Sequence, residues 1–538
     1  MLRDVARRLS RNGVGKGSVT TQELLAAYRE CQKGNSFEPQ QTFSTREIFA
    51  NTEVHMDKIK VIGFDYDFTL AAYKTELQRL IYSAARDHLV EHKRYPKKLR
   101  NTEFDKQFAV RGLTFDKTRG LLFKLGPNFK VDLSSVFKGR QRLEHSEALD
   151  AFGGTSHMQR SNTLVGIFDQ FSLAEACLLA DVCEFFFSNE ISFSPAALYQ
   201  DISSSISNVH TSGVMHGAVM NNTSKYLHKS PKLRKLLTEF REGGVETFVM
   251  SNSSFDYIDR GMRYLCGDDW LELFDVVMTD TQKPSFFSSK NPFRQIDLGT
   301  SPASSRRIKW SEVTKLEPGS AYSKGNVDDL MRMTGWQGDQ VLYVGDHIFA
   351  DLRRPARNHG WWTAAIVHEL ETEIKKQATP EYQSVAFRIQ MLEEILRRVQ
   401  WAPSTTDPNF DLMGLLDELE QERIQLRREM NDMFNPNFGS VFTAAANNTS
   451  LFSSSLERYV DLYTSRLENF LDYGPGNKYR FYPRRKRLLA HEPPVVSVAS
   501  KLEDKLKKNI SRGDVMLRQE HSFMLDDDED DAKAGSST

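Results

Sequence analysis

Residues 58–71 read KIKVIGFDYDFTLA, and this stretch decides the fold class. Its apolar run at 61–64 is short and rich in bulky side chains, which predicts a buried strand. Two aspartates, Asp65 and Asp67, follow the run directly, and Thr69 comes two positions later. An acidic turn at the end of a buried strand is a common place for an α/β protein to bind a ligand.

Three further apolar stretches carry the same signature. We predict strands at 245–250 (VETFVM), 274–279 (FDVVMT) and 341–344 (VLYV). A helix is predicted over 230–242, because Ser230 is a good N-cap and Pro231 suits the first turn. Strands that alternate with helices indicate a mostly parallel sheet with crossover connections. The expected fold class is therefore α/β.

Polar residues follow each predicted strand. Ser251 and Asn252 come after the second strand, and Lys283 lies shortly after the third. Asp346 comes after the fourth strand, with Asp351 five residues further on. The carboxyl ends of parallel strands share one edge of the sheet, so we expect these side chains to meet there. One such residue is a weak signal, but the ordered set is a strong one.

The set suits a phosphoryl-transfer site. Carboxylates at positions 65, 67 and 346 are the oxygen ligands that Mg²⁺ prefers. Asp65 could attack phosphorus, and Asp67 could protonate the leaving oxygen and later deprotonate the attacking water. We expect Ser251, Asn252 and Lys283 to bind the phosphate. Thr69 and Asp351 are expected to support the site.

These motifs resemble the haloacid dehalogenase (HAD) superfamily, with Asp65 and Asp67 in its DxDxT pattern. The strings FDYDFTLA, KPSFF and GDHIFADL are similar to those of the cytosolic purine 5'-nucleotidase family, and particularly to its branch of 5'-nucleotidase domain-containing proteins. The resemblance implies a HAD-like Rossmannoid core with an inserted cap, Mg²⁺ as cofactor, and hydrolysis of nucleoside 5'-monophosphates, above all purine nucleotides. It also implies a homo-oligomer, either a dimer or a tetramer.

The resemblance divides the chain into five parts. The expected core comprises residues 51–72 and 230–375, and a mostly helical cap spans 73–229 between them. A helical C-terminal region, 376–500, is expected to pack on the core. The ends are an N-terminal extension at 1–50 and an acidic tail at 501–538, where the run DDDEDD predicts disorder.

The cap departs from the family pattern next to its aromatic residue. Phe171 corresponds to the family's phenylalanine and is our candidate for contact with the substrate base. The family's following asparagine is replaced here by Ser172. Two readings stay open: an active 5'-nucleotidase, or a scaffold or regulatory protein with the fold and little turnover.

Two other patterns allow more than one reading. His88 and His92 belong to HLVEH, a zinc motif of inverted metallopeptidases, but a five-residue match inside a predicted cap favours an ordinary helix. Leucine and methionine recur near heptad spacing over 412–433, which fits a coiled coil with another subunit or packing against the chain's own core. We favour the structural reading of the first pattern and packing within the chain for the second.

Composition excludes several classes of protein. The 538 residues carry 71 Lys and Arg against 72 Asp and Glu, so no basic excess suggests nucleic acid as a partner. No apolar run is long enough to cross a bilayer, and only four cysteines occur, without a CxxC pair. A reducing, cytoplasmic location is expected. The arginine-rich residues 1–16 leave a mitochondrial transit peptide as the alternative.

Overall fold

The computed structural model describes residues 43–299, 308–401, 412–444, 448–473, 479–484 and 491. The chain forms two compact units. The larger comprises Pro39–Val385 and Gln425–Pro494, and the smaller comprises Met1–Glu38, Ala386–Ile424 and Val495–Thr538. The predicted targeting segment and acidic tail lie outside the described residues, so both stay predictions.

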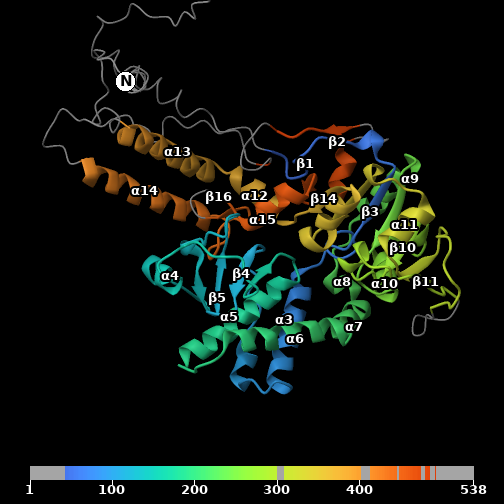
Figure 1. Cartoon of the computed structure of the whole chain (residues 1–538), viewed down its shortest axis with the longest axis horizontal. Coiled ribbons are helices and arrows are strands. Elements are labelled where there is room, and N and C mark those ends of the chain that lie inside the picture. The colour runs from blue at the N-terminus through green and yellow to red at the C-terminus, as the bar shows by residue number, and fades with distance from the viewer. Residues whose placement is uncertain are drawn as a thin grey trace, which may run out of the picture. The chain divides into compact units, whose positions relative to one another are not determined.

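A nine-stranded sheet forms the centre of the larger unit (Figure 1). Seven neighbouring strands run parallel, and an antiparallel strand closes each edge. In spatial order the strands are β1 (Phe49–Ala50), β17 (Leu462–Thr464), β14 (Trp362–Ile366), β13 (Val341–Gly345), β3 (Val61–Phe64), β9 (Glu246–Met250), β10 (Val276–Thr279), β12 (Ala321–Lys324) and β11 (Phe293–Gln295). The α/β fold class is confirmed, as are all four predicted strands, which are adjacent in the sheet.

The sheet also contains strands that the sequence analysis did not anticipate. β12 and β14 extend it on both sides of the predicted four. β17 is the most informative case, because it lies inside the region expected to be helical and pairs in parallel with β14. Its three residues, LYT, are too short to stand out from the helical pattern around them.

A second sheet lies in the segment between β3 and β9. Its five antiparallel strands are ordered β7 (Gln141–Arg142), β6 (Phe137–Lys138), β5 (Leu121–Lys124), β4 (Leu113–Asp116) and β8 (Leu164–Ile167). The helices of this segment are α3 (Thr75–Glu91), α4 (His145–Ala151), α5 (Ser172–Ser188), α6 (Pro195–Thr211), α7 (Val214–Asn221) and α8 (Thr223–Tyr226). The mostly helical segment that we expected therefore carries its own sheet.

Helices of the larger unit connect the parallel strands (Figure 1). They include α9 (Pro231–Glu242), α10 (Phe255–Cys266), α11 (Val327–Thr334), α12 (Glu369–Gln377) and α15 (Leu451–Tyr459). The prediction for α9 is confirmed: Ser230 caps the amide of Lys232, and Pro231 is the first helical residue. Its leucines and Phe240 are buried, which is the amphipathic arrangement that the sequence predicts.

Two long helices occur toward the C-terminus, α13 (Pro380–Trp401) and α14 (Leu412–Asp432). Within the smaller unit, Arg388 of α13 and Glu422 of α14 form an ion pair of 3.2 Å. Leu419, Leu426 and Met430 of the heptad pattern are buried. The choice between packing within the chain and a coiled coil with another subunit stays a prediction. Across the described residues, we find no helix long and apolar enough to cross a membrane.

Gly63, in the middle of β3, permits a close approach that positions the end of this strand. Phe248 of β9 is fully buried, and its ring occupies the space where a Cβ at position 63 would lie. Phe248 also stacks on Tyr343 of β13, with ring centroids 6.0 Å apart. The absence of a side chain at Gly63 thus lets three central strands pack around one aromatic ring.

We predict that Gly63→Ala destabilises the protein, because the added methyl overlaps the Phe248 ring in a packed core. Overpacking of this kind typically lowers the free energy of unfolding by ~1–3 kcal/mol. Gly217→Ala in α7 is the matched control, because its Cβ would meet no atom within 4 Å. This control should be neutral or stabilising by ~0.5–1 kcal/mol. Equal urea unfolding midpoints for the two variants would contradict the assignment.

Candidate active site

The predicted polar residues meet at the carboxyl edge of the nine-stranded sheet. Asp65 directly follows β3, Ser251 follows β9, and Asp346 follows β13. Lys283 lies beyond the end of β10 and reaches the same edge. The parallel order β13, β3, β9, β10 brings residues that are far apart in sequence into one site.

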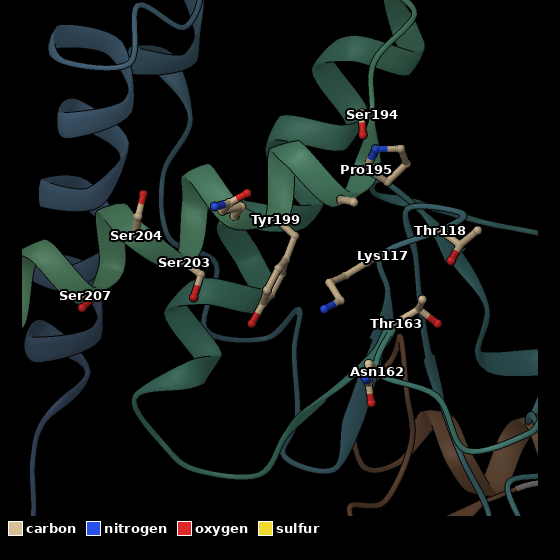
Figure 2. Close-up of a pocket in the computed structure, with 12 residues that line it drawn as sticks. Lys117, Thr118, Asn162, Thr163, Ser194, Pro195, Tyr199, Ser203, Ser204 and Ser207 are labelled. Atoms are coloured by element: carbon tan, nitrogen blue, oxygen red, sulfur yellow. The ribbon is translucent and has the colours of Figure 1, made fainter. Parts of the chain in front are cut away.

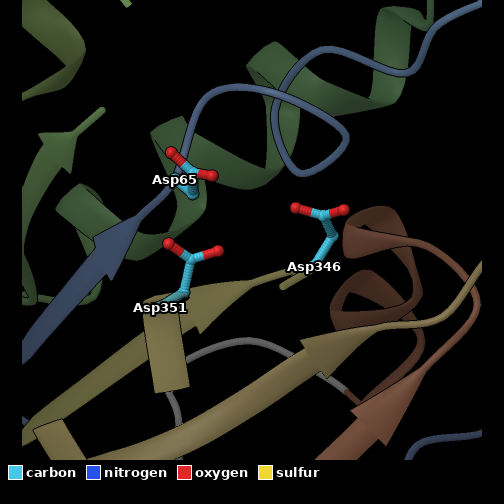
Figure 3. A group of neighbouring side chains, drawn as sticks. All are labelled: Asp65, Asp346 and Asp351. Carbon is cyan, nitrogen blue, oxygen red and sulfur yellow. The ribbon is translucent and has the colours of Figure 1, made fainter. Parts of the chain in front are cut away.

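Three carboxylates converge in the centre of this site. Asp65, Asp346 and Asp351 are all buried, and each offers an oxygen within 4.8 Å of the others (Figure 3). Burial raises the pKa of Asp65 to about 8, even though Lys283 lowers it. Burial, followed by the charge of Asp351, also raises the pKa of Asp346 well above its ordinary value. Such a group of acids is stable in the ionised form only beside positive charge.

Lys283 supplies part of that charge. Its Nζ lies 2.7 Å from Oδ1 of Asp65 and 2.7 Å from Oδ1 of Asp351, and it donates to the Tyr343 hydroxyl at 3.0 Å. Burial opposes the charge on Lys283, but Asp351 and Asp65 outweigh it and raise the pKa of the ammonium well above its usual range. Lys283 therefore stays protonated and links two of the three acids.

The remaining donors suit a divalent cation. Among the described residues, no hydrogen-bond donor contacts the side-chain carboxylate of the buried Asp346. A buried carboxylate without a partner is unfavourable, so this oxygen pair needs a cation or water. Asp65 and Asp346 present hard oxygen donors, which fit Mg²⁺. We predicted Asp65, Asp67 and Asp346 as the metal ligands. The structure instead groups Asp351 with Asp65 and Asp346.

Asp67 points to a different set of neighbours. Its Oδ1 accepts a 2.6 Å hydrogen bond from Tyr73, and its Oδ2 accepts a 2.7 Å bond from Ser253. The hydroxyls of Tyr73 and Tyr257 are themselves 2.8 Å apart. Asp67 is thus held beside the acidic group rather than in it, and its role as a metal ligand stays a prediction.

The two predicted phosphate-binding residues after β9, Ser251 and Asn252, make different contacts. Ser251 is buried, and its hydroxyl accepts a bond of 3.1 Å from the Ser253 amide. The Asn252 side chain binds the backbone of Lys283 instead: Oδ1 accepts from its amide at 2.5 Å, and Nδ2 donates to its carbonyl at 3.0 Å. Asn252 therefore fixes the lysine that reaches the acids.

A cavity of about 760 Å³ opens beside Asp67. Asp67, Asn252 and Ser253 line one part of it, and Phe171 and His210 line another. The Phe171 ring packs edge-to-face on Phe68 and on His210, with centroid separations of 4.8 and 5.4 Å. Burial and then His216 lower the pKa of His210, so this imidazole is neutral near pH 7. Phe171, the candidate for contact with the nucleobase, therefore lines the same cavity as Asp67, the candidate general acid and base.

Arg111 is a buried residue beside the site that sequence reasoning missed. It is fully buried and binds both carboxylate oxygens of Glu369, at 2.7 and 2.6 Å. Its third contact is a 3.2 Å hydrogen bond to the carbonyl of Asp346. Arg111 precedes β4, so it ties the segment between β3 and β9 to the strand end that carries Asp346. An arginine 258 positions from its partner gives no sequence signal.

Another cavity lies along α6, and none of the three acids lines it. It measures about 860 Å³ and follows the N-terminal half of α6 (Figure 2). Lys117 lies over the ring of Tyr199 there, 5.4 Å from its centroid, and hydroxyl and amide side chains supply most of the other polar groups. Among the described residues that line this cavity there is no acid, so they do not offer the groups that phosphoryl transfer requires.

The histidines singled out in the sequence have structural partners. Nδ1 of His88 lies 3.0 Å from the hydroxyl of Ser205, and His92 caps the end of α3. Within the described ranges, neither belongs to a group of residues that could hold a metal. A third histidine, His347, follows Asp346 and accepts from the amides of Phe349 and Ala350.

Comparison with known proteins defines the class. A family model described as the 5' nucleotidase family matches residues 48–494. The human and rat 5'-nucleotidase domain-containing protein 2 are each 36% identical to the chain over 458 residues, which is 83% of this chain and 85% and 80% of theirs. A 5'-nucleotidase domain-containing protein of Dictyostelium discoideum is 34% identical over 441 residues, 80% of this chain and 73% of that one.

These matches, together with the buried acids at the sheet edge, indicate a hydrolase. The chain belongs to the 5' nucleotidase family.

We predict that the metal-free protein loses stability as pH rises from about 4 to about 8. Over this window the folded state keeps a proton on Asp65 (pKa about 8) that the unfolded chain, near 3.8, has released. The folded state binds more protons, so the free energy of unfolding falls with increasing pH. Urea unfolding in EDTA at several pH values measures the slope. Asp65→Asn should flatten it, whereas Asp57→Asn at the surface should not; equal slopes would contradict the prediction.

Proposed function

We propose that the chain is a Mg²⁺-dependent 5'-nucleotidase that hydrolyses nucleoside 5'-monophosphates, preferentially purine nucleotides, through a phosphorylated Asp65. The observation that carries this proposal is the position of Asp65, paired with Lys283 at 2.7 Å and grouped with Asp346, beside the cavity that Asp67 lines. Nucleophile, countercharge and acid–base residue are thereby present within one site.

The chain's own residues divide the reaction into two steps. An oxygen of ionised Asp65 attacks phosphorus, the bond to the ester oxygen breaks, and Asp67 donates a proton to the leaving nucleoside. A water then attacks the phospho-aspartate, Asp67 takes up its proton, and phosphate leaves with Asp65 restored. Lys283 favours the ionised state of Asp65 in both steps. Mg²⁺ held by Asp65 and Asp346 would supply charge neutralisation for the phosphate.

Tyr73 and Ser253 position Asp67 for this work. Each donates to one of its two oxygens, so the carboxyl group cannot rotate freely. Proton delivery to the leaving oxygen requires that one of these bonds opens, and Ser253 is the more adaptable donor because its hydroxyl rotates.

We infer that residues 73–229 act as the cap and that Phe171 contacts the nucleobase. The shared cavity supports this assignment, because Phe171 and Asp67 both line it. Aromatic rings stack on any base, so Phe171 would supply affinity, and the purine preference rests on the family resemblance. A cytoplasmic location and a dimeric or tetrameric assembly are likewise predictions from the sequence.

One observation favours the alternative of a scaffold with weak turnover. Ser172 replaces the family's asparagine beside Phe171, and its hydroxyl is bound to Oδ2 of Asp169 at 2.5 Å. Its amide is bound to the other oxygen of Asp169 at 2.9 Å. Ser172 is the first residue of α5, and both of its donors are engaged by Asp169 within the protein.

We predict that phosphate release from nucleoside 5'-monophosphates requires both Mg²⁺ and Asp65. Asp65→Asn removes the nucleophile and should lower kcat by at least about 10³-fold. EDTA should abolish turnover, and Mg²⁺ should restore it. A panel of purine and pyrimidine nucleotides, assayed for released phosphate, gives the base preference.

Two variants make this experiment specific. Asp67→Asn should keep the nucleophile and accumulate phosphoprotein from ³²P-labelled substrate, because release of the phosphate lacks its base. Asp57→Asn changes an exposed aspartate outside the site and should retain the full rate. Unchanged turnover in Asp65→Asn would refute the nucleophile, and folded wild-type protein inactive on the whole panel would favour the scaffold.

We further predict that Phe171→Ala raises KM for nucleotides without a matching effect on ribose 5-phosphate, which has no base to stack. Base–aromatic stacking contributes about 1–3 kcal/mol, equivalent to roughly 5- to 150-fold in KM. The comparison of kcat/KM for the two substrates cancels any general damage to the site. An equal loss for both substrates would show that Phe171 supports the structure and does not contact the base.

A further inference from the structure

We propose that a small tetrahedral dianion of the phosphate type binds a second cavity, which adjoins the end of the catalytic loop and is lined by other residues than the nucleotide cavity. We call it the rear cavity and define it by Thr69, His228, Lys229, Lys232 and Arg466. It measures about 280 Å³, and none of the residues that line it lines the cavity of Asp67 and Phe171.

Three segments supply most of the wall of the rear cavity, and Leu265 and His368 complete it. The first is the end of the catalytic loop, at Thr69, Leu70 and Ala72, and the second is the start of α9 with the residues before it. The third is the segment 466–468 that follows β17. The cavity therefore has walls from the loop, a helix and the C-terminal part of the large unit, and it has room for a dianion with accompanying water.

Positive charge dominates its lining. Lys229, Lys232 and Arg466 face a single carboxylate in the lining, Glu468. Arg466 also pairs with Glu371 at 2.9 Å, whereas for Lys229 and Lys232 no carboxylate of the described part of the chain lies within 4.0 Å. An excess of unpaired ammonium groups around an enclosed space favours a multiply charged anion.

His228 is affected by one of these cations, Arg466. Its pKa is lowered first by burial and then by the charges of Lys74 and Arg466, against which Glu76 acts alone. Neighbouring cations thus discourage a further positive charge at this position. The positive end of α9, a helix of twelve residues that begins at Pro231, points into the same region and adds to the attraction for an anion.

Thr69 supplies an independent observation. The residue is only 5% exposed and lines the rear cavity, yet its hydroxyl has no hydrogen-bond partner among the described residues. A buried hydroxyl without a partner is unfavourable, so a ligand oxygen that accepts its proton would relieve a real deficit. The cations and the hydroxyl together match the surface of a phosphate-type oxyanion, which offers several acceptor oxygens and no apolar surface.

The rear cavity is coupled to the active site through one short loop. His368 lines it and lies 3.0 Å through Nε2 from the carbonyl of Phe68. Phe68 and Thr69 directly follow Asp67, so an anion held there restrains the segment that carries the acid–base residue. If the proposed function holds, phosphate is also the product of the reaction, and binding at the rear cavity would regulate kcat rather than compete with substrate.

The first experiment measures binding without turnover. The full chain is titrated with sodium sulfate at constant ionic strength, with chloride as the balancing salt, and the shift in Tm is recorded. A ligand of the folded state raises Tm by mass action. Sulfate also stabilises proteins generally, so the readout is the difference between variants. Lys229→Gln/Lys232→Gln should weaken the sulfate-dependent shift at least about tenfold in apparent Kd, as expected on losing two charge-assisted contacts.

The control changes the same charge elsewhere. Lys97→Gln/Lys98→Gln replaces two exposed lysines outside the cavity and should keep the wild-type response. Thr69→Val, which removes only the hydroxyl, should weaken the response without altering the net charge. An identical sulfate response in wild type, the Lys229/Lys232 variant and Thr69→Val would overturn the proposal.

The second experiment tests regulation. Sulfate should change kcat of the wild type and of the Lys97/Lys98 control, but not of the Lys229/Lys232 variant; an effect on KM alone in all proteins would mean competition at the catalytic site. The two proposals fail separately. A protein without turnover that still shows the variant-specific Tm shift would refute the nucleotidase, whereas turnover with no such shift would refute the rear cavity.

Discussion

The structure depends on one electrostatic constraint: three carboxylates and one ammonium group are buried together at the end of a parallel sheet. Lys283 neutralises part of the charge on Asp65 and Asp351, and Asp346 has no donor of its own in the part of the chain that the structure describes. Removal of charges from water is expensive unless they are paired. The deficit of positive charge therefore makes the site receptive to a cation, and the same field would repel a phosphate that arrived without one.

The surrounding residues hold this arrangement in place from several directions. Asn252 fixes the backbone of Lys283 with both ends of its amide, and Tyr343 receives a hydrogen bond from the lysine side chain. Arg111 approaches from the other sheet and binds the carbonyl of Asp346. The β13, β3 and β9 strands share the ring of Phe248, which fits only because residue 63 is glycine. The packing of the larger unit therefore holds the acids and the lysine in position.

Much of this could be predicted from the sequence, since short apolar strands followed by polar residues have a strong local signature. The four central strands and the meeting of Asp65, Lys283 and Asp346 were predicted from that signature. The features that we did not predict are contacts between residues far apart in sequence, or elements too short to give a local sequence pattern. Arg111 and Glu369 are ordinary charged residues until the fold pairs them, and β17 is a three-residue strand in a helical context. The hydrogen bond from Ser253 to Asp67 could not be predicted either, because the two residues are 186 positions apart.

The edge pairing of the large sheet has a consequence for synthesis of the chain. β1 forms its ladder with β17, with Phe49 opposite Tyr463, 414 positions later. At a rate of about 5–20 residues per second, a ribosome needs roughly 20–80 s to make the intervening chain. Throughout that interval the N-terminal strand has emerged without its partner, and the sheet lacks one edge. Completion of the sheet therefore waits for residues 462–464, and a nascent chain stalled before residue 462 would expose an unpaired edge to the cell's chaperones.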